Sequence, residues 1–125
     1  MKKEIILILD DDLGITEALA LALEAEHRTI VTCCDVAAAQ LVIEKMPISL
    51  LLTDIRLTGS FAFEGLELID HVRRHSPSTR IALMTGAPST ELRLEAIRRG
   101  ALAVFNKPFE IDDVEDLILS TESVQ

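Results

Sequence analysis

The sequence predicts an α/β fold in which five parallel β strands alternate with five α helices. Short, continuous runs of apolar residues recur along the chain, as in 4–9 (EIILIL) and 49–53 (SLLLT). Runs of this length are typical of strands that are covered on both faces. The segments between them repeat apolar residues at helical spacing. This alternation requires crossover connections and favours a parallel sheet between two layers of helices.

Local sequence patterns predict the positions of the five strands and of the first two helices. The predicted strands cover residues 4–9, 29–34, 49–53, 80–84 and 102–106. The first helix is predicted over 13–26, where Leu19 and Leu23 share an apolar stripe. Asp35 is a suitable N-cap for the second helix, and Pro47 stops it.

The remaining helices complete the alternation. The third is predicted over 66–75 from its apolar repeat, and the fourth runs from a cap at 89 or 90 to Gly100. The fifth is expected to start from a cap at 112 or 113. The economical arrangement is a flavodoxin-like, doubly wound (βα)5 fold with strand order 2-1-3-4-5.

Size and charge narrow the class of protein. A chain of 125 residues with 49% hydrophobic residues is expected to form one domain over 1–125, with a polar tail at about 120–125. Its 21 acidic against 12 basic residues argue against nucleic-acid binding by this domain. No apolar run approaches the roughly 20 residues that cross a bilayer, so we expect no membrane contact and a cytoplasmic location. Cys33 and Cys34 are adjacent on a strand, which excludes a disulfide between them.

Acidic residues gather where two predicted strands end. Asp10, Asp11 and Asp12 follow the first strand, and Asp54 follows the third. In a doubly wound sheet these ends meet at one edge, where ligands bind. Clustered carboxylates must be protonated, solvated or neutralised, and hard oxygen ligands suit Mg²⁺. For any single acid the alternative is a solvated loop residue or a helix cap, as for Asp12.

The last two strands add a hydroxyl and a cation to this edge. Thr85 ends the fourth strand, and Lys107 follows the fifth. Metal-binding acids, an acceptor carboxylate, a hydroxyl and a lysine suit phosphoryl transfer to an aspartate. The metal and the ammonium neutralise the phosphoryl oxygens, and the hydroxyl hydrogen-bonds one of them.

Four motifs in order, ILILDDD, LLLTDIRLTG, IALMTG and NKPF, resemble those of the receiver domains of bacterial response regulators over nearly the whole chain. The resemblance implies that Asp54 is the phosphoacceptor of a two-component or phosphorelay system. It also implies that Asp10, Asp11 and Asp54 bind Mg²⁺, with the backbone carbonyl of Arg56 as a further ligand.

The same resemblance assigns the other groups and the partners. Thr85 would bind the phosphoryl group and Lys107 would ion-pair with it, with a cis bond before Pro108. A sensor histidine kinase or a histidine phosphotransfer protein would be the donor. The domain would catalyse its own phosphorylation and dephosphorylation and would not be a turnover enzyme. Its output would run through the fourth helix, fifth strand and fifth helix, to an effector domain or a homodimer partner.

Two departures from the family pattern concern how phosphorylation of Asp54 would be transmitted to a partner. Val104 stands where the family usually has Tyr or Phe, and Phe105 is expected to face the opposite side of the sheet. The loop over 57–65 is longer than usual and carries Phe61 and Phe63, which either cover the third helix or contact a partner.

Two other functions are consistent with parts of the sequence. One is an interaction module with the receiver fold but without phosphorylation. The other is a small phosphatase similar to the haloacid dehalogenases, with Asp10 as nucleophile, although Leu13 interrupts that motif. His71 and His75 are four residues apart and could bring two imidazoles to one metal, but the surrounding sequence favours a solvated helix face.

Overall fold

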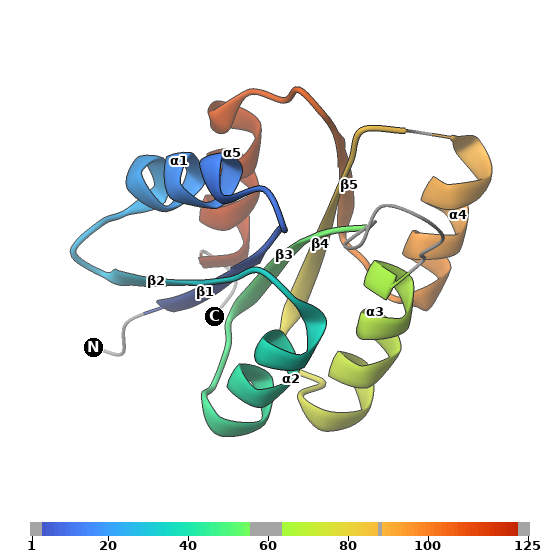
Figure 1. Ribbon diagram of the computed structural model, residues 1–125, viewed down its shortest axis with the longest axis horizontal. Coiled ribbons are helices and arrows are strands. Elements are labelled where there is room, and N and C mark those ends of the chain that lie inside the picture. The colour runs from blue at the N-terminus through green and yellow to red at the C-terminus, as the bar shows by residue number, and fades with distance from the viewer. Residues whose placement is uncertain (1–3, 56–63, 88, 123–125) are drawn as a thin grey trace.

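A computed structural model of the chain describes residues 4–55, 64–87 and 89–122 (Figure 1). The elements are β1 (Glu4–Leu9), α1 (Leu13–Leu23), β2 (Arg28–Cys33), α2 (Val36–Lys45), β3 (Leu50–Asp54), α3 (Glu64–His75), β4 (Arg80–Thr85), α4 (Thr90–Arg99), β5 (Ala103–Asn106) and α5 (Ile111–Glu122). The strands form one parallel sheet in the order β2-β1-β3-β4-β5. The predicted fold class and strand order are confirmed.

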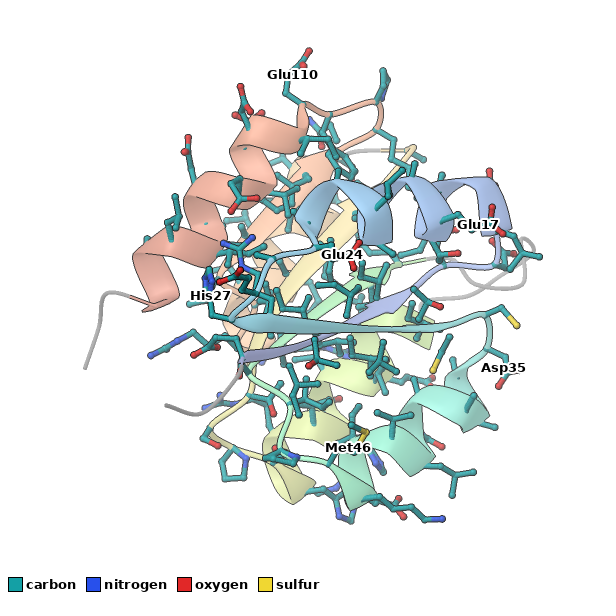
Figure 2. The ribbon with its side chains drawn as sticks, turned by 90° about the vertical axis from the view of Figure 1, so that its left-hand side faces the viewer. Glu17, Glu24, His27, Asp35, Met46 and Glu110 are labelled. Carbon is teal, nitrogen blue, oxygen red and sulfur yellow. The ribbon has the colours of Figure 1, made fainter. Side chains whose placement is uncertain are left out.

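Helices cover both faces of the sheet. Helices α1 and α5 lie on one face and α2 and α3 on the other, as the side view shows (Figure 2). Successive side chains of β1 pack alternately on the two faces of the sheet. Leu7 and Leu9 lie on the α2 and α3 side, and Ile6 and Ile8 lie on the α1 and α5 side. All four are buried. Burial on both faces is the physical reason for the continuous apolar strand sequences.

Some element boundaries differ from those predicted. Helix α1 ends at Leu23, before residue 26, because Glu24 leaves the helical conformation and Ala25 bridges to Arg28. Helix α5 already begins at Ile111, so Asp112 and Asp113 lie in its first turn, and the prediction that one of them is the cap was wrong. Acids favour this position through the helix dipole as well as through capping, so composition could not separate the two.

The predicted caps of α2 and α4 are confirmed. Asp35 accepts a hydrogen bond from the Ala38 amide at 2.8 Å, and Ser89 accepts one from the Leu92 amide at 3.1 Å. Gly100 ends α4 with φ at +120°, a conformation that favours glycine. These caps fix the start of the helices that flank the sheet.

Two polar features at helix contacts were not predicted. Arg28 is 6% exposed, donates a hydrogen bond to the Leu23 carbonyl at 3.2 Å, and forms an ion pair with Glu115 of α5. The prediction of a solvated helix face was wrong for His71, because its side chain is 13% exposed and lies 3.6 Å from Glu44 of α2. A four-residue spacing cannot tell which neighbouring helix covers a side chain.

The cysteines are free, as expected: Cys33 is half-buried and Cys34 is exposed. In the described part of the chain, no helix has the length and apolar content needed to cross a membrane.

Candidate functional site

The carboxyl ends of β1 and β3 bring three carboxylates together. Asp10 follows β1 and is fully buried, Asp11 is exposed, and Asp54, the last residue of β3, is 9% exposed. One oxygen from each of the three lies within 4.8 Å of the others. No other group of three or more potential metal-ligating residues this close occurs among residues 4–55, 64–87 and 89–122.

The arrangement of these acids fits a hard divalent cation. The Asp12 amide donates a hydrogen bond to Asp10 Oδ1 at 2.9 Å, which orients that carboxylate. Desolvation, together with the charges of Asp10 and Asp54, raises the pKa of Asp11. A cation between the carboxylates would relieve this repulsion, and oxygen ligands are those that Mg²⁺ prefers.

Lys107 bridges the two buried carboxylates. Its Nζ lies 2.7 Å from Asp10 Oδ2 and 3.0 Å from Asp54 Oδ2. Burial opposes the charge of the ammonium group, but the hydrogen bonds to Asp10 and Asp54 outweigh burial and raise the pKa of Lys107. The lysine is therefore held as a cation directly beside Asp54.

Thr85 ends the neighbouring strand β4 and is 2% exposed. Its Oγ1 accepts a hydrogen bond from the Ala87 amide at 3.0 Å. The Lys107 amide donates a bond of 2.7 Å to the Thr85 carbonyl, which ties the end of β5 to β4. The peptide bond between Lys107 and Pro108 is cis, as predicted.

Gly65 contributes to the site in a way that the sequence did not reveal. A Cβ at this position would lie 2.7 Å from the carbonyl oxygen of Asp54 and 2.7 Å from the Cα of Ile55. The Gly65 amide donates a hydrogen bond to the Ile55 carbonyl at 3.0 Å. The start of α3 thus packs directly on the backbone of the strand that carries Asp54, and only glycine allows this approach.

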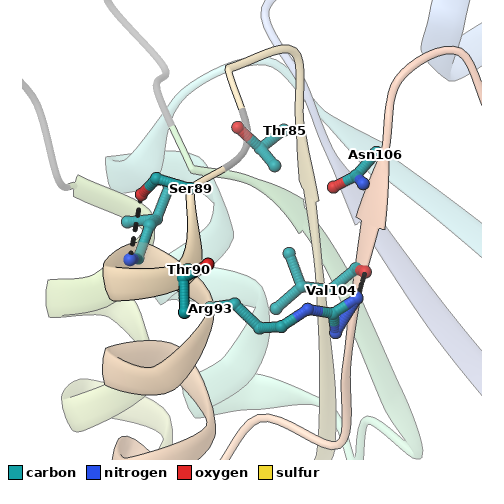
Figure 3. Close-up of a pocket in the computed structure, with 7 residues that line it drawn as sticks. Thr85, Ser89, Thr90, Arg93, Val104 and Asn106 are labelled. Carbon is teal, nitrogen blue, oxygen red and sulfur yellow. Dashed lines mark hydrogen bonds between the residues drawn. The ribbon is translucent and has the colours of Figure 1, made fainter.

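A pocket of about 260 Å³ opens beside Thr85, between α4 and β5 (Figure 3). It is lined by Thr85, Ser89, Thr90, Leu92, Arg93, Val104 and Asn106. Val104 is 6% exposed, and the guanidinium of Arg93 donates a hydrogen bond to its carbonyl oxygen (Figure 3).

Phe105 does not fill this space. It packs on the opposite side of the sheet, where its ring centroid is 5.7 Å from that of Phe109. The expectation that Phe105 cannot substitute for an aromatic residue at 104 is confirmed.

Three positions named from the sequence fall on residues that the structure does not describe. They are the backbone carbonyl of Arg56 and the side chains of Phe61 and Phe63. The other predicted site residues, Asp10, Asp11, Asp54, Thr85 and Lys107, lie together at the carboxyl edge of the sheet.

Known proteins resemble this chain in sequence. Residues 6–119 match the family model of the response regulator receiver domain. The nitrogen assimilation regulatory protein NtrX of Azorhizobium caulinodans is 36% identical over 107 residues, which cover 86% of this chain and 23% of NtrX. Sporulation initiation phosphotransferase F of Bacillus subtilis is 29% identical over 119 residues, which cover 94% of this chain and 93% of that protein.

Solved structures resemble it as well. A CheY-like response regulator receiver domain protein from Methanospirillum hungatei superposes with a TM-score of 0.85 at 26% identity, covering 97% of this chain and 95% of that one. The chain belongs to the response regulator receiver domain family and has the phosphoacceptor role of two-component signalling. It spans about a quarter of the length of several relatives, at 23% for NtrX and 26% for PilR of Pseudomonas aeruginosa.

Proposed function

We propose that Asp54 is the residue that accepts the phosphoryl group. The observation that carries this proposal is the position of the Asp54 carboxylate, which contacts the Lys107 ammonium and lies within 4.8 Å of both Asp10 and Asp11. A nucleophile for phosphoryl transfer needs positive charge around the transferred oxygens. Lys107 supplies it beside both Asp10 and Asp54, and of these two carboxylates Asp54, at 9% exposed, is the one that a donor can reach, because Asp10 is fully buried.

The transfer starts from a phosphohistidine on a sensor histidine kinase or a histidine phosphotransfer protein. A carboxylate oxygen of Asp54 attacks phosphorus, forming the new P–O bond while the P–N bond breaks. The electron pair of that bond stays on the donor imidazole, which takes up a proton. Lys107 ion-pairs with a phosphoryl oxygen, and the Thr85 hydroxyl donates a hydrogen bond to another.

Asp10, Asp11 and Asp54 would hold Mg²⁺, with the Arg56 carbonyl as a further ligand. When bound, the ion neutralises charge on the phosphoryl oxygens and lowers repulsion between the carboxylates. The fit rests on three carboxylates that offer hard oxygen ligands and whose combined negative charge exceeds the single positive charge of Lys107.

The chemistry ends on the protein itself. Water attacks phosphorus in the aspartyl phosphate, the bond between phosphorus and the Asp54 oxygen breaks, and inorganic phosphate leaves, so Asp54 returns to the carboxylate and the domain completes one phosphorylation cycle without converting a separate substrate. Residues 1–125 act as one receiver unit, a proposal supported by the family match over 6–119.

An apolar surface next to the site suits the phosphodonor. A groove of about 360 Å³ runs along α1 and the segment after β5, lined by Ile15, Ala18, Leu19, Lys107, Pro108, Phe109 and Ile111. Because Lys107 belongs to both the groove and the acidic site, a helix that docks in the groove can bring its phosphohistidine to Asp54.

The output surface is proposed to be α4, β5 and α5. Leu94 and Ile97 of α4 and Leu102, just before β5, are 62%, 43% and 47% exposed, and a homodimer partner or an effector domain would cover these apolar side chains. The beryllofluoride-activated receiver domain of NtrC4, which is 26% identical with a TM-score of 0.79 over 94% of this chain and 93% of that one, is a dimer.

Acetyl phosphate with Mg²⁺ tests the assignment. Intact mass measurement should show one added phosphoryl group on the native chain, none on Asp54→Asn, and the native result on Asp112→Asn, an exposed acid of α5. Beryllofluoride should shift amide resonances around residues 54 and 85. If neither treatment changes the native chain, the interaction module without phosphorylation replaces this proposal.

A further inference from the structure

A buried imidazole nitrogen lacks a hydrogen bond where α2 contacts α3. His71 Nε2 is the one buried side-chain nitrogen or oxygen without a hydrogen-bond partner in the described part of the chain. Buried polar atoms in folded proteins are almost always satisfied, and an exception requires an explanation, such as an ion. The site lies on the α2 and α3 face, outside the acidic cluster.

The distance between His71 and the Glu44 carboxylate is close to that between two ligands of one metal ion. Glu44 Oε2 lies 3.6 Å from His71 Nε2, which is too far for a good hydrogen bond. Two ligands bound to a tetrahedral Zn²⁺ at about 2.0–2.1 Å stand about 3.3 Å apart. The two atoms therefore face each other across a gap that an ion would fill with little movement.

A second imidazole lies on the next turn. The ring of His75 is 4.2 Å from that of His71, with 34° between the ring planes. His75 is exposed and is the last residue of α3, so its side chain is free to turn. The His75 side chain must turn to reach the metal, because the ligand atoms of Glu44, His71 and His75 do not all lie within 4.8 Å of one another. Among the described residues, only the acidic cluster meets that criterion.

The protonation of His71 favours a metal. Burial, and then the neighbouring His75, lower the pKa of His71, while Glu44 opposes them and Arg74 adds to the lowering. The ring is thus predominantly neutral near pH 7, which is the form that binds metals.

We propose that Glu44, His71 and His75 form a Zn²⁺ site that joins α2 to α3. Two imidazole nitrogens and one carboxylate oxygen are a known donor set for zinc, with the fourth position left to water. This inference does not depend on phosphorylation of Asp54. Its consequence is that Zn²⁺ fastens α2 to α3, two of the helices that pack on this face of the sheet.

Co²⁺ titration with excess Mg²⁺ present tests the site, because the Mg²⁺ competes with Co²⁺ for the oxygen ligands of the acidic cluster and because Co²⁺ at a four-coordinate site absorbs visible light. The native chain should bind one Co²⁺ that Zn²⁺ displaces. Loss of a residue that only orients a metal ligand lowers metal affinity about 10-fold to 100-fold. Glu44 and His75 would bind the ion directly, so Glu44→Gln and His75→Ala should each lower the affinity for Co²⁺ at least about tenfold. His27→Ala changes a histidine in the turn between α1 and β2, and this variant should bind as the native chain does.

Thermal unfolding gives a second readout, since Zn²⁺ bound only to the folded chain raises its midpoint. The rise should occur in the native chain and His27→Ala and be lost in His75→Ala. Equal affinity in native and His75→Ala chains would overturn the site, as would the absence of binding. Sulfur-to-cobalt charge-transfer bands in the near ultraviolet would also overturn it, by assigning the ion to Cys33 and Cys34.

Discussion

The guanidinium of Arg93 reaches from α4 to the carbonyl oxygen of Val104 on β5 and bonds it at 3.4 Å. Strand β5 is the edge of the sheet and pairs with β4 alone. A carbonyl on an edge strand has no strand partner on its outer side, so this bond satisfies a group that would otherwise need water. An arginine and a small side chain thus share the space beside Thr85.

Val104→Phe should therefore be accommodated. The added ring can enter the pocket of about 260 Å³ beside Thr85. Filling existing space increases the free energy of unfolding by about 0.5–1 kcal/mol in favourable cases, and we expect a gain in this range. Denaturant unfolding measures it.

Val114→Phe is the matched control, because Val114 is fully buried against the other face of the sheet. Overpacking there should cost about 1–3 kcal/mol. A loss of stability in Val104→Phe as large as in the control would show that the pocket cannot take a ring.

Gly65→Ala should weaken the fold at the acceptor strand. The new Cβ would meet the backbone of Asp54 and Ile55 at 2.7 Å, so the start of α3 must move away. We expect a loss of about 1–3 kcal/mol in the free energy of unfolding, in the range of overpacked sites. Gly86→Ala is the control, since a Cβ there meets nothing within 4 Å. Equal effects of the two changes would contradict the packing argument.

Asp11→Asn should make the metal-free protein more stable near neutral pH. Folding raises the pKa of Asp11. At a pH above this raised pKa the ionised Asp11 therefore lowers the free energy of unfolding, and the loss disappears as the pH falls through the folded-state pKa. The midpoint of thermal unfolding of the native chain without Mg²⁺ should therefore lie below that of the variant at pH 7. The difference should shrink in acid.

Addition of Mg²⁺ should reverse this order. The native chain gains stability by binding the ion, whereas the variant has lost a carboxylate ligand and gains less. Asp112→Asn, which changes an exposed acid that is not part of the cluster, should respond to Mg²⁺ as the native chain does. An identical response of Asp11→Asn would remove Asp11 from the metal site.

Lys107→Met should change how stability depends on alkaline pH. The folded state raises the pKa of Lys107 above its ordinary value of 10.5. The stability that its pairing provides is complete below 10.5 and is lost as the pH rises through the folded pKa. The native chain should therefore lose stability relative to the variant in that range. Parallel curves from urea titrations at pH 9 to 11.5 would mean that the pairing contributes nothing.

The topology and most of the site follow from the sequence because they depend on local patterns. Continuous apolar strands dictate the layers, and parallel strands necessarily place Asp10, Asp54, Thr85 and Lys107 at one edge. No local pattern could indicate the burial of His71, the ion pair of Arg28 with Glu115, or the approach of Gly65 to Asp54. Each of these depends on which distant segment packs against the residue.

The two adjacent cysteines give the protein a built-in position for a reporter group. Cys34 is exposed, whereas burial, and then the nearby Asp35 and Cys34, raise the pKa of Cys33 and slow its reaction with electrophiles near neutral pH. The Asp10 amide bonds the Cys33 carbonyl at 3.3 Å, so this segment is joined to the acidic cluster. The sequence contains neither Trp nor Tyr. The emission of a fluorophore attached to Cys34 would thus be free of Trp and Tyr fluorescence. Its attachment point lies one residue after β2, the strand whose last residue, Cys33, bonds to Asp10.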